Sequence, residues 1–162
     1  MNIKKLAFNG ILAAAYAAIT LLTSSFAYGP IQFRVAEALC VLCFFSPSAV
    51  WGVTLGCAIA NLFSPIAIID VPVGTLATLI GCLLASKCKH PALVPVPVIL
   101  SNAILVGAEL AVMYMPEQLL HGFLLFGSQV AIGEIAVLYA LGLPLLLMLK
   151  RRSVHRQMLT VF

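Results

Sequence analysis

The positions of its few charged residues constrain this chain more than any other feature. Only 9% of the residues are charged and 63% are hydrophobic, yet Glu37, Glu109 and Glu134 lie inside long apolar stretches. A charged side chain near the centre of a bilayer costs roughly 2.5–3.5 kcal/mol, so it persists only where it faces other protein or a water-filled cavity. The pattern therefore predicts a polar binding site inside a small membrane bundle.

The composition also indicates the class of protein. Soluble domains are about 45–50% apolar and about 25% charged. We therefore expect an integral protein of the cell membrane, with residues 1–162 as a single domain. Lys4 and Lys5 give a basic start, but the apolar run continues past residue 20 with no convincing cleavage site, so no signal peptide is expected. The basic residues lack the aromatic interleaving of a single-strand binder, so no nucleic-acid partner is expected.

Six apolar segments are separated by turns rich in Pro, Gly and Ser: 6–26, 34–46, 49–64, 71–86, 93–115 and 122–149. The second and third are shorter than the roughly 20 residues of a full span, so one broken helix is the alternative. Six spans place every basic cluster on one side of the membrane: Lys4/Lys5, Lys87/Lys89 and Lys150/Arg151/Arg152/Arg156. This positive-inside pattern predicts an all-α bundle of six transmembrane helices with both termini in the cytoplasm. Gly142 and Pro144 predict a tilt or kink near the cytoplasmic end of the last span.

Under this topology most strong hydrogen-bonding groups lie in the outward-facing half. The candidate substrate-binding residues are Gln32, Arg34, Glu37, Asn61, Asp70, Asn102, Glu109, Gln129 and Glu134. The inner half is mostly Leu, Ile, Val and Ala, which predicts a solute pocket open to the outside and closed below. Tyr28 and Phe33 are candidates to stack on a flat ligand, and Trp51, on the cytoplasmic side, is a weaker one.

Structural roles are the alternative for several of these residues. Arg34 and Glu37 are three residues apart, the spacing of a local ion pair at a helix start. Asn61 and Asn102 suit hydrogen bonds between helices, and Asp70 suits a helix cap. Glu109 and Glu134 are the hardest to explain in this way. Gly107 and Gly133 adjoin them and would allow either close ligand approach or tight helix packing.

The donor and acceptor types indicate the ligand class. Three carboxylates and several amides with one Arg suit a neutral or cationic polar molecule with donor edges. A carboxylate can accept two N–H bonds from an amidine-like edge such as that of guanine.

A second feature is a ridge of small residues in the first span. Gly10, Ala14 and Ala18 form this ridge, and Ala13 and Ala17 lie beside it. A second ridge comprises Gly52, Gly56 and Ala60. Small residues spaced by four let helix backbones approach closely, which serves packing within the bundle or docking of a partner membrane protein.

Several function classes lack their motifs. The sequence has no Walker A, HExxH or GxSxG motif, so we expect no ATP hydrolysis by this chain, no enzyme activity, no cofactor and no metal. The five cysteines include a CxxC pair, Cys40 and Cys43, but we expect free, buried thiols. A stand-alone proton-coupled carrier of a small polar solute stays an alternative, as does a structural membrane adaptor.

Five stretches resemble the QueT family of queuosine-precursor transporters in order and spacing: G-P-I-Q-F-R-V-A-E-A-L (29–39), A-N-L (60–62), D-V-P-V-G-T-L-A-T-L (70–79), S-N-A-I-L-V-G-A-E-L (101–110) and G-E-I with L-G-L-P-L (133–145). That family is similar to the substrate-binding S components of energy-coupling factor (ECF) transporters. The resemblance implies a six-helix bundle with a pocket near the outer face, partly covered by the loop after the first span. It implies as partners a transmembrane coupling protein and two cytoplasmic ATPases.

The resemblance also implies roles for individual residues. S components dock through AxxxA patterns, which Ala13/Ala17 and Ala14/Ala18 match, and are thought to topple in the membrane. The implied ligand is a 7-deazaguanine precursor of queuosine, namely preQ0, preQ1 or queuine, although an S component for another vitamin-like ligand is the alternative. On this view Glu109 or Glu134 contacts the base edge, Asn102 the carbonyl, and Glu37 or Asp70 the amine of preQ1.

Overall fold

The structure is a computed structural model that describes residues 3–27 and 33–151. Within these ranges every regular element is helical, which confirms the all-α prediction. Four helices are long: α1 (Ile3–Leu22), α4 (Ala67–Ala85), α5 (Pro95–Tyr114) and α6 (Leu119–Val137). Each is about 30 Å long, close to the thickness of the hydrocarbon core. In the described part of the chain, four helical stretches are long and apolar enough to cross a membrane.

Two shorter helices occupy the second and third predicted segments. These are the 3₁₀ helix η1 (Val35–Phe44) and the helix α3 (Ala49–Asn61). A 3₁₀ helix rises about 2 Å per residue, so the ten residues of η1 reach about 20 Å, further than an α-helix of equal length. Neither helix alone matches the length of a full span, so the six-span count stays a prediction.

Short helical turns occupy the connectors: α2 (Ser24–Ala27), η2 (Pro91–Leu93) and η3 (Pro116–Gln118). Proline begins η2, η3 and α5, because its fixed φ suits the first helical position and the N–H that it lacks would be unpaired there. These prolines therefore set where the chain turns back between long helices.

The last predicted segment is one long helical stretch with an irregularity. α6 passes into a π-helical turn, η4 (Leu138–Gly142), and then into α7 (Leu143–Arg151). A Cβ at Gly142 would lie 2.9 Å from Cγ1 of Val41, so glycine lets η1 approach this turn closely. The sequence predicts a tilt or kink at this point, and the structure has a π-helical turn there.

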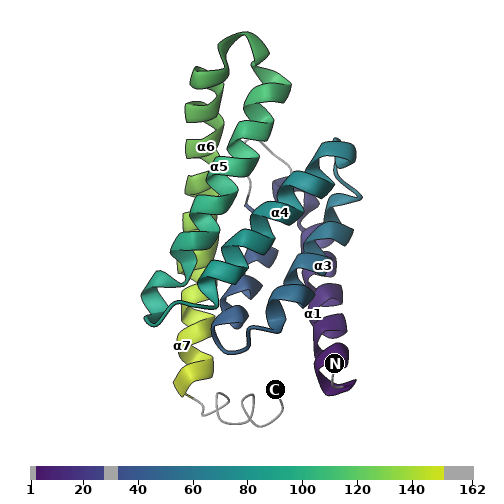
Figure 1. Ribbon diagram of the computed structural model, residues 1–162, viewed down its shortest axis with the longest axis vertical. Coiled ribbons are helices and arrows are strands. Elements are labelled where there is room, and N and C mark those ends of the chain that lie inside the picture. Colours follow the sequence, from purple (N-terminus) through teal and green to yellow (C-terminus); the bar gives the residue numbers. More distant parts are fainter. Residues whose placement is uncertain (1–2, 28–32, 152–162) are drawn as a thin grey trace.

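The helices form a bundle in which chain neighbours pack side by side (Figure 1). α1 packs on α3, α3 on α4, α4 on α5 and α5 on α6. The α5–α6 hairpin extends beyond the upper ends of α3 and α4. η1 contacts helices from both sides of the bundle, and its residues Ala36, Cys40, Val41 and Cys43 are fully buried. η1 is therefore the central element around which the other helices are arranged.

Two helix pairs approach closely through glycine. A Cβ at Gly56 of α3 would lie 2.7 Å from the carbonyl oxygen of Ala13, and one at Gly107 of α5 would lie 2.6 Å from Cα of Gly127 on α6. Gly52 meets the backbone of Asn9 in the same way. The small-residue ridge of α3 thus packs against α1 within the bundle, and Gly107 serves helix packing.

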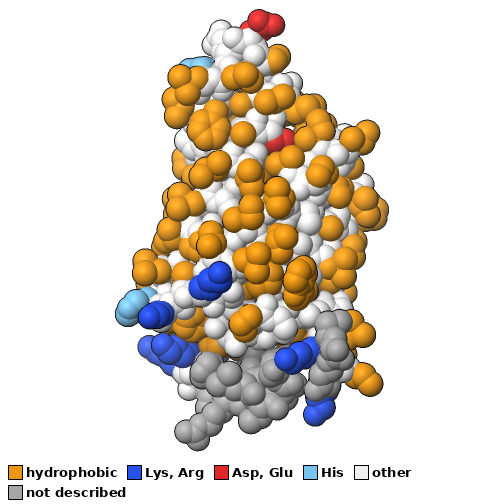
Figure 2. Space-filling view, in the orientation of Figure 1, with side chains coloured by type: hydrophobic (Ala, Val, Ile, Leu, Met, Phe, Trp, Pro, Cys, Tyr) orange, Lys and Arg blue, Asp and Glu red, His pale blue; other side chains and the backbone are white. Residues whose placement is uncertain are grey.

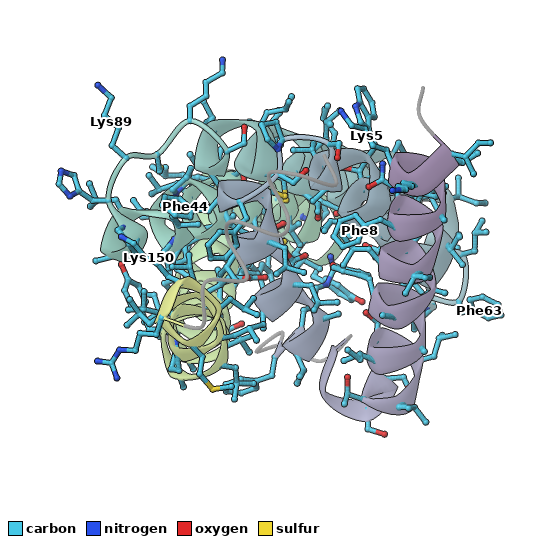
Figure 3. All side chains as sticks on the ribbon, turned by 90° about the horizontal axis from the view of Figure 1, so that it is seen from below. Lys5, Phe8, Phe44, Phe63, Lys89 and Lys150 are labelled. Carbon is cyan, nitrogen blue, oxygen red and sulfur yellow. The ribbon has the colours of Figure 1, made fainter. Side chains whose placement is uncertain are left out.

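Basic side chains gather at one end of the molecule (Figure 2). Seen from that end, Lys5, Lys89 and Lys150 lie around the same face (Figure 3). The beginning of α1 and the end of α7 are at this end, whereas the α5–α6 connection with Glu117 is at the other (Figure 1). This is the charge distribution on which the positive-inside argument depends, and the orientation in the membrane stays a prediction.

Candidate binding site

The predicted polar residues gather in the interior of the bundle. Of the nine candidates, seven are more than nine-tenths buried: Arg34, Glu37, Asn61, Asp70, Asn102, Glu109 and Glu134. They come from η1 and its N-cap, α3, α4, α5 and α6. Gln129 is half-buried on α6. Gln32 and the aromatic Tyr28 lie outside the described residues.

Glu37 of η1 is a fully paired carboxylate. Its Oε1 accepts hydrogen bonds from the hydroxyl of Tyr16 at 2.5 Å and from that of Thr78 at 3.2 Å. Its Oε2 accepts one from the thiol of Cys40 at 2.8 Å. Because Tyr16 is on α1 and Thr78 on α4, Glu37 ties the central η1 to two outer helices.

Arg34, Asn61 and Asp70 form a second connected group. Nη2 of Arg34 donates to Oδ1 of Asn61 at 3.4 Å, and Nδ2 of Asn61 donates to the backbone carbonyl of Asp70 at 2.9 Å. The Ser64 hydroxyl donates to the Asp70 carboxylate. A Cβ at Gly74 would lie 2.6 Å from Nδ2 of Asn61, so glycine makes room for this amide beside α4.

These contacts decide two of the structural alternatives. The N-cap of α4 is Ile66, and Asp70 lies four residues further on, so the prediction that Asp70 caps this helix is wrong. Arg34 and Glu37 have different hydrogen-bond partners, on α3 for Arg34 and on α1 and α4 for Glu37. A local Arg34–Glu37 ion pair therefore does not account for the position of either side chain.

Asn102 of α5 and Glu134 of α6 form an incomplete pair. Nδ2 of Asn102 donates to Oε1 of Glu134 at 3.4 Å, a long hydrogen bond between two helices. Oδ1 of Asn102 and Oε2 of Glu134 are buried and have no partner among the described residues. A buried polar atom without a hydrogen bond costs about 1–3 kcal/mol, so the pair is set up to accept further donors.

Glu109 of α5 is the least satisfied carboxylate of the cluster. Both of its oxygens are buried, and no donor group in the described part of the chain hydrogen-bonds to either of them. Its carboxyl group lies close enough to that of Asp70 for the two to share a proton and to interact electrostatically. Arg34, whose Nε is also unpaired, is the cation of the cluster and interacts electrostatically with Glu37 and Glu134. Free acceptors thus exceed free donors, which suits a donor-rich or cationic ligand.

The structure adds residues that sequence reasoning missed. Tyr16, Thr78 and Cys40 complete the shell of Glu37, and Gly74 makes room for Asn61. The spacing of Asp70, Gly74 and Thr78 was an available signal, since residues four apart share one face of a helix. Of the aromatic candidates, Trp51 is 63% exposed at the start of α3 and Phe33 is 37% exposed.

The small residues of α1 divide into two sets. Ala13 and Ala17 are buried, with Ala13 against Gly56 of α3. Ala14 and Ala18 are exposed on the other side of the helix. The docking prediction is therefore carried by Ala14 and Ala18, and it stays a prediction.

The cysteines are free thiols, as the sequence predicts. Four are buried and Cys88 is half-buried. The described residues contain no group of three or more His, Cys, Asp or Glu side chains arranged to hold a metal ion.

Apolar helices of membrane-spanning length that enclose carboxylates, amides and a guanidinium define a multi-pass membrane protein with an internal polar site. Residues 6–151 match the family model described as QueT transporter. The chain therefore belongs to the QueT transporter family, whose members are transporters rather than enzymes, and it is a multi-pass protein of the cell membrane.

A curated relative supports this assignment. The protein named queuosine precursor transporter QueT, from Lactococcus lactis subsp. cremoris (strain MG1363), is 42% identical over 86 residues. The match covers 49% of this chain and 50% of the relative, so the chain matches about half the length of that protein. No solved structure matches the chain.

Proposed function

We propose that this chain is the substrate-binding subunit of an ECF-type importer that takes up a 7-deazaguanine precursor of queuosine. The family match and the name of the curated relative support the substrate class. The observation that carries the proposal is the set of buried, unpaired polar atoms on Arg34, Asn102, Glu109 and Glu134. Burying such atoms without hydrogen-bond partners is unfavourable, and a bound ligand would supply the missing partners.

The free atoms fit the edges of a deazaguanine. Oε2 of Glu134 and Oδ1 of Asn102 are acceptors on facing helices, suited to the N1–H and N2–H₂ donors of the base. The free Nε–H of Arg34 is a donor suited to the ring carbonyl, beside the second N–H of the Asn102 amide, whose first N–H donates to Glu134. Glu37 is too fully paired to take part and instead supports the site.

The proposal includes partner proteins. Energy for import comes from two cytoplasmic ATPases acting through a transmembrane coupling protein, since this chain has no nucleotide-binding motif. Ala14 and Ala18, exposed along α1, form the surface on which the coupling protein docks. The lipid bilayer surrounds the remaining apolar surface.

Thermal unfolding of the purified chain in detergent tests the binding function. The ligands are preQ0, preQ1, queuine, guanine and a panel of vitamins. A ligand that binds only the folded state raises the melting temperature by mass action, so we expect shifts with the deazaguanines alone. A shift with a vitamin alone would mean that the substrate is that vitamin instead of a deazaguanine, and the fold assignment would be unaffected. No shift with any compound would overturn the binding function.

A second measurement tests the need for partners. Liposomes that contain this chain alone should take up no substrate, even with a pH gradient imposed across the membrane. Uptake driven by the gradient would identify a stand-alone proton-coupled carrier and would contradict the subunit role.

A further inference from the structure

The carboxylates of the buried cluster differ in how many of their oxygens are free to accept a hydrogen bond from a ligand. Glu37 accepts three hydrogen bonds, and Glu134 accepts one and has one free oxygen. Glu109 has two free oxygens although it is only 6% exposed. Glu109 is therefore the carboxylate with the greatest unused capacity to accept donors.

Glu109 also has an acidic neighbour. The Asp70 carboxyl lies within hydrogen-bonding reach of that of Glu109 and interacts with it electrostatically, and Asp70 also accepts a hydrogen bond from the neutral Ser64 hydroxyl. Two carboxylates close together in a region of low dielectric repel each other unless a cation or a shared proton lies between them. Among the described residues, Arg34 is the cation that faces this cluster, and its Nη2 donates to Asn61.

The charge of the whole cluster also favours a cationic ligand. It contains four carboxyl groups, on Glu37, Asp70, Glu109 and Glu134, and one guanidinium. The lysines Lys5, Lys89 and Lys150 belong to the basic end of the bundle, which Figure 3 shows from below. A ligand that carries a positive charge would compensate part of this imbalance.

The acidic pair lies at a distance from the atoms assigned to the base. Asn102 and Glu109 are seven residues apart on α5, which places them on one face of the helix about 10 Å apart along its axis. An elongated ligand can therefore contact the Asn102–Glu134 pair with one end and the Asp70–Glu109 pair with the other.

We propose that Asp70 and Glu109 together bind a primary ammonium group of the ligand, so that the site selects a deazaguanine with an aminomethyl arm over one with a neutral nitrile. This inference rests on the proposed function, because it assigns the second end of the same ligand. An ammonium offers three donors, one for each free oxygen of Glu109 and one for Asp70. A nitrile offers no donor and leaves both oxygens of Glu109 unpaired.

The test compares preQ1 with preQ0, which share the base and differ in the arm. Calorimetry on the unmodified chain should give at least about tenfold tighter binding of preQ1, the effect of one charged hydrogen bond. Glu109→Gln, and separately Asp70→Asn, should lower the affinity for preQ1 about tenfold or more. The affinity of each variant for preQ0 should stay within about threefold of that of the unmodified chain. Glu134→Gln, at the base end, should weaken both ligands equally.

Several results would overturn the assignment. Equal affinity of the unmodified chain for the two ligands does so without any variant, and so does an equal loss of both ligands in Glu109→Gln. Binding can also be measured in a buffer in which the bulky organic cation N-methylglucamine replaces Na⁺. If this replacement weakens the binding of preQ1 and preQ0 equally, the Asp70–Glu109 pair holds a metal ion instead of the aminomethyl arm. Binding of neither ligand overturns the proposed function as well, whereas tight binding of preQ0 without preference for preQ1 overturns this inference alone.

Discussion

Single residues in the interior belong to two groups, those whose polar atoms are paired and those whose atoms are free. Glu37 is completely buried and completely paired, through Tyr16, Thr78 and Cys40. Glu134 is as deeply buried but keeps one oxygen free. Since both are equally removed from lipid, burial alone does not separate a structural carboxylate from a binding one. The state of its hydrogen bonds does.

Tyr16→Phe tests the structural role of Glu37. The substitution removes the 2.5 Å hydrogen bond and keeps the ring, so it should destabilise the ligand-free chain by about 1–3 kcal/mol through the unpaired acceptor. Thermal unfolding in detergent measures the loss, and ligand affinity should stay nearly unchanged. A large loss of affinity with an unchanged melting temperature would place Glu37 in direct contact with the ligand.

Glu134→Gln tests the binding role of the other carboxylate. Charged hydrogen bonds contribute about 1.5–3 kcal/mol, so deazaguanine affinity should fall about 10–100-fold. Ser128→Ala is a matched control on the same helix, because its exposed hydroxyl bonds only the backbone of Leu125. Unchanged affinity in Glu134→Gln would remove this residue from the site.

At the level of elements, close contact between helices depends on glycine at defined positions. Gly56 of α3 faces the backbone of Ala13 and the Cβ of Tyr16, both 2.7 Å from an added Cβ. Gly10 of α1 has no atom within 4 Å of that position. The two glycines therefore differ in packing although both lie in small-residue ridges.

Gly56→Ala and Gly10→Ala form a matched pair that tests this difference. Gly56→Ala should destabilise the chain by about 1–3 kcal/mol, because α1 and α3 must move apart. Gly10→Ala should be neutral or stabilising, since alanine favours the helix by up to about 1 kcal/mol. Chemical or thermal unfolding in detergent compares them. Equal effects would contradict the close α1–α3 packing.

The helices also show which features of the fold the sequence predicts and which it does not. Hydropathy and turn residues predict each helical segment, because apolar runs and prolines are local signals. They do not predict that η1 is a 3₁₀ helix at the centre of the bundle, since this depends on contacts with seven other elements, α1, α3, α4, α5, α6, η4 and α7. The polar residues are predictable as a set, but which acceptors stay free depends on partners such as Thr78, 41 residues from Glu37 in sequence.

At the level of the whole molecule, charge separates the two ends. The exposed basic side chains gather at one end, and the α5–α6 connection with Glu117 forms the other (Figure 2). By the positive-inside rule we expect the basic end to face the cytoplasm. Together with a buried polar cluster, this polarity predicts a defined orientation for a solute-binding protein.

Cysteine labelling in intact cells tests this orientation. In a Cys88→Ser background, Glu117→Cys should react with a membrane-impermeant maleimide from outside, and Lys89→Cys should react only after permeabilisation. Both positions are exposed, so reactivity reports the side of the membrane rather than burial. The reverse pattern would invert the predicted topology, and reaction of both in intact cells would contradict an odd number of spans between them.

The exposed face of α1 should matter only when partners are present. Ala14→Leu with Ala18→Leu adds bulk on the side of α1 away from α3, so ligand binding by the purified chain should be unchanged. Close approach by a partner helix would be blocked, and cellular uptake and co-purification with the coupling protein should both be lost. Ala136→Leu, at an exposed position of α6, is the matched control and should retain uptake. Uptake that survives the double substitution would show that partners dock on another face. Loss of binding as well would mean that α1 shapes the site itself.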